Sequence, residues 1–352
     1  MKPRNCLFFF IIFVLSSKEQ IEANKAVDHA PIGVMGDHYH KKGEWMFSIR
    51  FSEMWMGDNV LDGNEISDSE ILELPNPFSV MPNMPMYLSV VPQKMTMKML
   101  MLGMMYAPTD NLTLMGMTMF NMKNMNLNTH RAMMDREYLG SFETSTSDIS
   151  NVSLTGLYRL TERENSRWHL HLGLDVGLGS NDSVGNVLTP MNQKMSMTSP
   201  YGMQVSDQAL RSILGLTNVS TFSDLIFGNQ LVFNKALAKK NWAYGSMLEF
   251  NSWFQKPIND AIALSARMQY TNQGSIEGND LRIHAPVQTA NPQNYGGETI
   301  NLGLGINTVF NILGGKSGDR FGFEIVIPLH QRKTGLQMKN SFSIILGIQK
   351  SF

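Results

Sequence analysis

Apolar and polar residues alternate along much of this chain, in segments of roughly ten residues, which is the length of a membrane-spanning β-strand. The clearest segment is 167–179, in which Trp168, Leu170 and Leu172 alternate with His169 and His171. A period of two places the two sets on opposite faces of a strand. We therefore expect a sheet with apolar surroundings on one side and water on the other.

The same alternation predicts strands over 44–56, 95–107, 112–125, 152–160, 167–179, 224–234, 241–254, 261–271, 299–311, 320–330 and 341–352. Short spacers such as 108–111, 161–166 and 314–319 contain the Pro, Gly, Asp and Asn typical of turns. Other connections are long and polar, namely 57–94, 126–148, 180–221 and 272–298. Tight turns and long loops therefore alternate along the chain.

An odd number of strands conflicts with a single-chain barrel, in which both termini lie on one side of the membrane and the strand number is even. If the strands are counted from the N-terminal end of the barrel, the stretch 180–221 falls on one side of the membrane, and if they are counted from the C-terminal end, it falls on the other side. We expect the missing strand within 203–219, although 207–216 also resembles a short helix. Twelve strands are predicted, and ten are the alternative.

The N-terminus has the pattern of a secretory signal peptide. Lys2 and Arg4 precede an apolar run over 6–15, and a polar stretch follows up to Ala23. Ten apolar residues are too few for a membrane-spanning helix, and no longer apolar run follows. We expect residues 1–23 to be removed, which also removes Cys6, the only cysteine. The mature chain then has no disulfide and no thiolate ligand.

The C-terminal segment 341–352 alternates to its end at Phe352. A C-terminal aromatic residue on an amphipathic last strand is the signal that the outer-membrane assembly machinery of Gram-negative bacteria recognises. A soluble β-sandwich is the alternative source of alternation, but the signal peptide, the absence of other cysteines and the loop pattern favour a membrane barrel. We predict an all-β protein, a transmembrane outer-membrane antiparallel β-barrel over 44–352 with long extracellular loops, in contact with lipid and lipopolysaccharide.

Composition excludes several other classes of protein. The chain has 29 Lys and Arg against 30 Asp and Glu, so no basic surface for a nucleic acid is expected. The sequence also lacks a Gly-x-Ser-x-Gly elbow, a His-Glu-x-x-His motif and a phosphate-binding glycine loop. We expect a protein that is not an enzyme and has no catalytic residues.

Two segments carry a family resemblance. Residues 29–46 read HAPIGVMGDHYHKKGEWM, and the segment 95–114 contains YAPTDNL. Both resemble a group of uncharacterised Gram-negative outer-membrane transporters that is related to the barrel family named for the meta-pathway of phenol degradation. The resemblance implies passive transport of a small solute, hydrophobic or aromatic, and brings no catalytic residues.

Histidines gather before the first predicted strand, in the segment 24–43, which we expect at the periplasmic side or as a plug in the barrel. The candidate metal ligands here are His29, Asp37, His38 and His40, with Met35 beside them. Imidazole with carboxylate suits Cu(II), Ni(II) or Zn(II), and thioether suits Cu(I). The alternative is a set of polar residues that only fills the lumen or faces water.

Methionine accounts for 28 of the 352 residues, and Met95, Met97, Met99 and Met101 share one face of a predicted strand. Their sulfurs would follow one another at intervals of about 7 Å. Such a row is either a relay for a soft ion, Cu(I) or Ag(I), or flexible apolar packing. The alternation does not decide whether this face meets lipid or lumen.

Charged and imidazole side chains on the polar faces of other strands are candidates for lining the lumen: Arg50, His169, His171, Asp175, Glu249, Arg267 and Glu324. The main functional expectation is a passive channel without a resident cofactor. The first alternative is a barrel that handles Cu(I) or Ag(I). The second is a structural or adhesive barrel with a blocked lumen.

Overall fold

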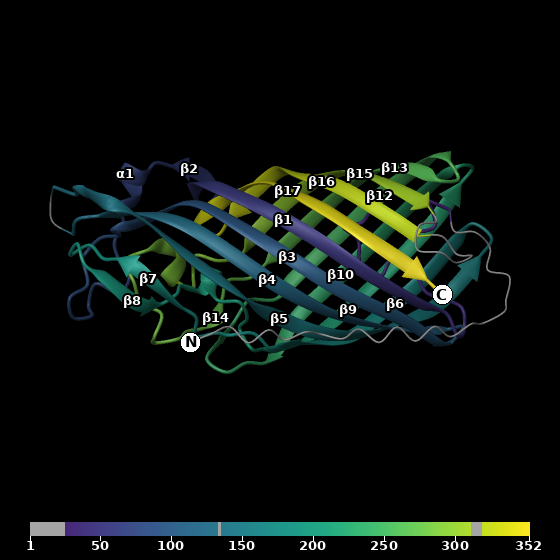
Figure 1. Ribbon diagram of the computed structural model, residues 1–352, viewed down its shortest axis with the longest axis horizontal. Coiled ribbons are helices and arrows are strands. Elements are labelled where there is room, and N and C mark those ends of the chain that lie inside the picture. Colours follow the sequence, from purple (N-terminus) through teal and green to yellow (C-terminus); the bar gives the residue numbers. More distant parts are fainter. Residues whose placement is uncertain (1–24, 133–134, 311–318) are drawn as a thin grey trace, which may run out of the picture.

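The computed structural model describes residues 25–132, 135–310 and 319–352, and twelve long strands of these residues form a closed antiparallel barrel (Figure 1). The strands are β1 (Trp45–Leu61), β3 (Val90–Thr109), β4 (Leu112–His130), β5 (Tyr138–Arg163), β6 (Ser166–Gly177), β9 (Leu210–Phe222), β10 (Leu225–Ala238), β12 (Met247–Asn259), β13 (Ile262–Gln273), β15 (Gly297–Phe310), β16 (Asp319–Lys333) and β17 (Leu336–Ser351). Each pairs with its neighbour in the chain, and β17 returns to β1. The prediction of twelve strands is confirmed.

The seam between β1 and β17 closes the sheet. Ile49 pairs with Ile348, and Phe352 exchanges two backbone hydrogen bonds with Trp45, at 2.8 and 3.2 Å. Closure satisfies the backbone groups that an open sheet edge would leave unpaired in hydrocarbon. No helix in the described parts of the chain is long and apolar enough to span a bilayer.

The predicted missing strand is β9, so the helical reading of 207–216 is wrong. Two other predictions need correction. Strand β12 begins at Met247 rather than at 241, because β11 (Trp242–Ala243) pairs with β14 (Glu277–Gly278) in a separate ribbon. The stretch 126–148 is largely strand, since β4 extends to His130 and β5 begins at Tyr138. The proposed signal peptide 1–23 lies outside the described residues.

Smaller elements lie at the end of the barrel opposite the C-terminus, which we call the loop end (Figure 1). They are β2 (Asn64–Ile66), α1 (Asp68–Ile71), β7 (Val184–Leu188), β8 (Lys194–Thr198), η1 (Tyr201–Met203), η2 (Gln288–Ala290) and the ribbon β11–β14. The other end, where the tight turns such as 110–111 and 164–165 lie, is the turn end.

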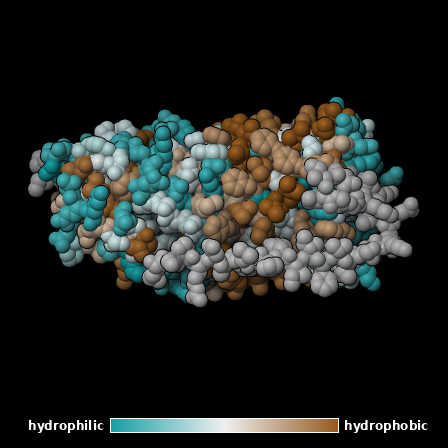
Figure 2. Space-filling model, viewed as in Figure 1, coloured by the Kyte–Doolittle hydropathy of each residue, from teal (hydrophilic) through white to brown (hydrophobic). Residues whose placement is uncertain are grey.

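On the face shown in Figure 2, apolar residues gather over the half of the barrel nearer the turn end, whereas the loop end is mainly hydrophilic. Exposed apolar side chains on β1, β6, β10, β13 and β16 belong to this apolar belt. Ile49, Leu172 and Leu174 in this belt are about half exposed. On β1, aromatic stacks mark the two rims: Trp45 with Tyr106 at 4.3 Å and Trp55 with Phe342 at 4.5 Å between ring centroids. Ten residues on a strand tilted by about 40° rise about 25 Å, which matches the apolar band of outer-membrane barrels.

Candidate functional site

The candidate site is the lumen, and at the turn end it is filled by residues 25–43, which we call the plug. Ile32 and Val34 are each 1% exposed, so this segment lies within the barrel. A turn from Pro31 to Val34 (2.9 Å) and the positive φ of Gly36 (+64°) fold it back on itself. The Ala30 amide then donates to the Asp37 carboxylate at 2.7 Å and closes the loop.

The plug has almost no secondary structure, so side chains of the barrel wall satisfy its carbonyl groups. Arg50 donates to the carbonyls of Ile32 and Val34 at 3.0 and 2.9 Å. Four further wall residues contact plug carbonyls: Gln230 with Met35, Gln255 and Asn307 with His29, and His169 with Gly36. Buried carbonyls need such partners, so these contacts dock the plug.

A buried ion pair supports the plug from the opposite wall. Arg267 and Glu324 are 2% and 0% exposed and lie 2.8 Å apart, and the Arg267 guanidinium also donates to Asn251 at 2.7 Å. The second Glu324 oxygen accepts the Gly33 amide at 2.9 Å. A Cβ at Gly33 would overlap both the guanidinium and the carboxylate, so only glycine fits there.

Three imidazoles are packed together in the plug. The ring centroids of His29 and His38 lie 4.2 Å apart, and those of His38 and His40 lie 4.9 Å apart, both in edge-to-face geometry. All three rings are at most 7% exposed. His38 Nδ1 lies 3.1 Å from an Asp37 oxygen. The plug thus brings together all four histidine and aspartate residues of the predicted metal set.

Burial lowers the pKa values of His29 and His38, and for His29 the proximity of His38 and Arg320 lowers the pKa further. Burial also acts to raise the pKa of Asp37, but His38 and His29, together with Arg320, outweigh it and hold that pKa well below its ordinary value. At neutral pH the two imidazoles are therefore neutral and the Asp37 carboxylate is ionised.

The predicted methionine row faces the lumen. Met101 pairs with Arg50, which contacts the plug, and paired residues share a face of the sheet. The row continues across β3 and β4 in the opposed pairs Met105 with Met115, Met101 with Met119, and Met95 with Met125. We call the inward-facing methionines of β3 and β4 the methionine wall: Met95, Met97, Met99, Met101, Met105, Met115, Met117, Met119 and Met125.

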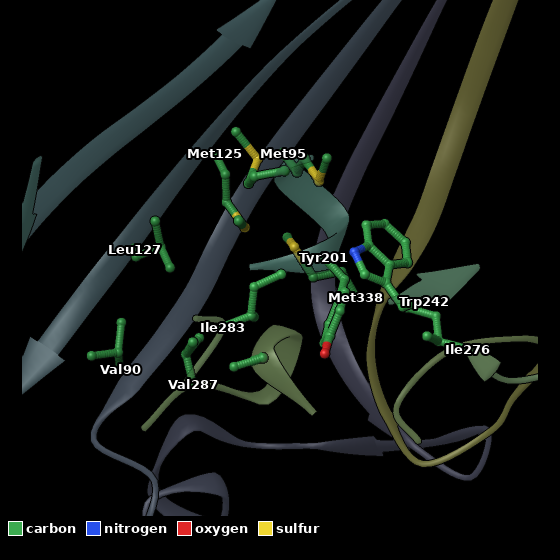
Figure 3. Close-up of a cluster of buried hydrophobic side chains, with 12 residues drawn as sticks. Val90, Met95, Met125, Leu127, Tyr201, Trp242, Ile276, Ile283, Val287 and Met338 are labelled. Atoms are coloured by element: carbon green, nitrogen blue, oxygen red, sulfur yellow. The ribbon is translucent and has the colours of Figure 1, made fainter. Parts of the chain in front are cut away.

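At the loop end the lumen is closed by segments 199–207, 242–244 and 276–290, which we call the cap. Their side chains point toward those of β3 and β4 and form the largest buried apolar cluster of the described residues (Figure 3). Tyr201, Met203 and Trp242 are each at most 1% exposed. Lys123 of β4 donates to the Gly202 and Gln204 carbonyls at 3.1 and 2.6 Å and ties the cap to the wall.

All seven predicted lumen residues lie on inward faces, but in different settings. Arg50, His169, Arg267 and Glu324 contact the plug, and His171 bonds Thr217 at 2.8 Å behind it. Asp175 and Glu249 lie between the plug and the cap and are partly exposed. Whether any of them controls permeation stays a prediction.

Sequence reasoning missed the residues that dock the plug, namely Gln230, Gln255, Asn307 and Arg320, and Lys123 at the cap. Each lies at an inward position of a predicted strand or next to one. Alternation identifies such positions, but it does not show which of them meet the plug or the cap.

No protein-family model and no curated protein matches the sequence. Among solved structures, an outer-membrane channel of Pseudomonas putida F1 is similar, with 13% identity over 91% of this chain and 99% of that chain and a TM-score of 0.55. The Pseudomonas putida toluene transporter TodX has 10% identity over 94% of this chain and 98% of that chain, with a TM-score of 0.46. At this identity the first likeness establishes the fold alone, that of an outer-membrane β-barrel.

Proposed function

We propose that the protein is an outer-membrane channel of a Gram-negative bacterium through which a small, largely apolar solute passes down its gradient. The apolar belt between two aromatic rims suits contact with lipid, and the hydrophilic loop end suits contact with lipopolysaccharide. The exposed Phe352 at the end of β17 is available as the assembly signal.

One observation carries the choice of solute, namely that methionines fill the inward positions of β3 from Met95 to Met105 except Gly103, although Asn121 and Lys123 separate the methionines of the opposed strand β4. Met105 and Met115 lie beside the plug, and Met95 and Met125 belong to the apolar cluster of the cap. Water-filled porins have a polar lumen. Such a strip of flexible thioethers is better suited to an apolar molecule, because methionine adapts its shape at little cost.

The plug and the cap act as two gates in this proposal. Each is held by hydrogen bonds from wall side chains, and neither contributes a strand to the barrel. Either segment can therefore move without opening the strand ladder. Met97, Met99 and Met101 lie between the gates and are only partly buried, so a solute that passes one gate meets thioethers there.

The experiment is uptake of N-phenyl-1-naphthylamine, a small apolar dye, by cells that express the protein in an otherwise intact outer membrane. We expect faster uptake than in cells without it. The variant with Met99→Glu and Met101→Glu should lose most of this increase, whereas Met99→Leu with Met101→Leu should keep it, because leucine preserves the apolar wall. Equal uptake in all four strains would contradict the channel and favour a barrel with a blocked lumen.

A second candidate function is passage of Cu(I) or Ag(I), favoured by the directly opposed methionine pairs. Residues opposed in an antiparallel pair have Cβ atoms about 5 Å apart, so Met101 and Met119 are near enough to ligate one soft ion. The leucine variant separates the two functions. If it keeps dye uptake but loses anaerobic Cu(I) binding, the sulfurs bind ions; if it binds Cu(I) as the parent does, they are packing.

A further inference from the structure

We propose that His29, Asp37 and His38 form a binding site for a borderline divalent cation of the Zn(II), Cu(II) or Ni(II) class, and that the bound ion holds the plug in its folded form. None of these three ligands belongs to the methionine wall. The metal-site proposal does not depend on the proposed transport of an apolar solute, because it is tested by a measurement of metal binding.

The first support is geometric. One ligand atom from each of the three residues lies within 4.8 Å of the other two, and the described residues contain no other such group of His, Cys, Asp or Glu. Tetrahedral ligands at about 2.0–2.2 Å from a metal are separated by about 3.4 Å. Small rotations of the imidazoles about their side-chain bonds therefore suffice to complete the site.

The second support is a set of buried nitrogens without partners. Nδ1 of His29 and Nε2 of His38 are inaccessible to water and have no hydrogen-bond partner, whereas Nδ1 of His38 contacts the Asp37 carboxylate. An unpaired polar atom in a protein interior is costly, and most such atoms in native structures are paired. A metal ion is the partner that an unprotonated imidazole nitrogen beside a carboxylate would take.

A fourth ligand is available in His40. Its Nε2 is also buried and unpartnered, whereas its Nδ1 lies 3.3 Å from a Glu44 carboxylate oxygen. Metal-bound histidines commonly contact a carboxylate through their other nitrogen, which fixes the ring orientation. Glu44 and His40 have this arrangement, which leaves Nε2 of His40 for the ion.

Charge and ligand type select the class of ion. One carboxylate and two imidazoles suit a borderline divalent ion better than Ca(II) or Mg(II), which take oxygen ligands. The nearby Arg320 adds a positive charge, but its guanidinium is engaged by the Ala30 carbonyl and by Gln349. A cavity of about 10 Å³ that Asp37 and His38 line has room for roughly one water molecule, which is a further ligand for the ion.

The ion would connect the two ends of the plug loop. His29 precedes the Pro31 turn, and Asp37 and His38 follow Gly36, so one ion would crosslink positions that the Ala30–Asp37 hydrogen bond and the packed rings of His29 and His38 already bring together. Because metal binding stabilises the conformation that contains the site, the docked plug should become more stable by mass action.

The test is calorimetric titration of the refolded chain without residues 1–23 with Zn(II), Cu(II) and Ni(II) separately. We expect one ion per chain with micromolar or tighter affinity. His38→Ala and Asp37→Asn should weaken binding at least tenfold, whereas His284→Ala, which alters a half-buried histidine of the cap outside the plug, should not change it. No binding, or binding that is equal in all variants, would overturn the proposal.

A second measurement on the unsubstituted chain removes the ambiguity of a misfolded variant. The Cu(II) form should give an electron paramagnetic resonance spectrum with hyperfine splitting from at least two imidazole nitrogens. A spectrum with oxygen ligands alone would show that the rings only pack against one another in the plug, and would also overturn the proposal.

Discussion

At the scale of single residues, the plug depends on a few buried polar groups that contact it from widely separated strands. Arg267 of β13 and Glu324 of β16 form an ion pair inside the barrel, and the same carboxylate accepts the Gly33 amide. A buried ion pair adds little to stability as a pair, but removal of one partner leaves an uncompensated charge. Glu324 is thus a position where one substitution affects the plug and the wall together.

We expect Glu324→Gln to lower the free energy of unfolding by about 3–5 kcal/mol, because it leaves the Arg267 guanidinium buried without a counter-charge. Urea unfolding of the refolded protein in lipid vesicles measures this change. The matched control is Glu65→Gln, which breaks the exposed ion pair with Lys339. It should leave the unfolding midpoint unchanged, and equal effects of the two substitutions would refute the structural role of the buried pair.

At the scale of elements, the plug is an insert rather than part of the sheet. Deletion of residues 25–40 should leave the barrel folded, since every pair of neighbouring strands keeps its ladder. Single-channel conductance in planar bilayers should then rise severalfold over that of the parent. Deletion of 191–193, at the exposed tip of the β7–β8 hairpin, should leave conductance unchanged. A deleted plug with parental conductance would mean that the cap alone closes the lumen.

Two carboxylates hold the segments of the cap together, and one of them, that of Asp207, also pairs with Arg211 of β9, so the stability of the cap depends on pH. Asp207 accepts the Tyr244 amide at 2.9 Å, and Asp280 is paired with Arg282 at 2.6 Å. Burial opposes ionisation of Asp207, but Arg211 and backbone amides outweigh it and lower its pKa, while Arg282 lowers the pKa of Asp280 to about 2.

A carboxylate whose pKa is lower in the docked cap than in the unfolded chain stabilises the docked cap fully at pH values above the unfolded pKa of about 3.9. This contribution is lost as the pH falls toward the pKa of the docked cap. The cap should therefore stay closed at neutral pH and loosen only below about pH 4. The cap can be followed through Met203, which is buried when the cap is docked. The cysteine of a Met203→Cys variant should react with dithiodipyridine only when the cap leaves the wall. Asp207→Asn should permit reaction at neutral pH, and Met191→Cys, which is exposed throughout, corrects for thiol reactivity. If the cap were already released near neutral pH, protonation of histidines rather than of Asp207 and Asp280 would control the cap, and the prediction would be wrong.

Alternation predicted eleven of the barrel strands because lipid and lumen impose different side chains on the two faces. It missed β9 because Ile213 and Val219 of that strand face inward while Ser212 faces outward, which blurs the period of two. The metal set was named from composition, yet the return of His29 to Asp37 depends on the turn at Pro31 and on Gly36. Several partners of the plug lie far from it in the sequence, such as Asn307, 278 residues from His29, where local patterns carry no information.

At the scale of the whole molecule, the barrel has two environments along its axis. The apolar belt lies only near the turn end (Figure 2), whereas the long strands β4 and β5 continue toward the loop end (Figure 1). This explains why polar stretches that were expected to be loops are strands. Outside the belt, strand pairing no longer requires apolar side chains on the outer face, and Asn, Ser and Thr suffice in water.

The position of the belt determines where a charge is tolerated. Leu172 lies near the middle of β6 on the outer face, so Leu172→Arg should destabilise the barrel in a bilayer by about 2–4 kcal/mol, the cost of an arginine at the midplane. Val80→Arg, at a loop residue that is 91% exposed, should have little effect. Urea unfolding in vesicles compares the two. A soluble barrel would tolerate both substitutions equally, because its outer face would meet water at Leu172 as at Val80; a difference confined to Leu172 requires that hydrocarbon surrounds the belt.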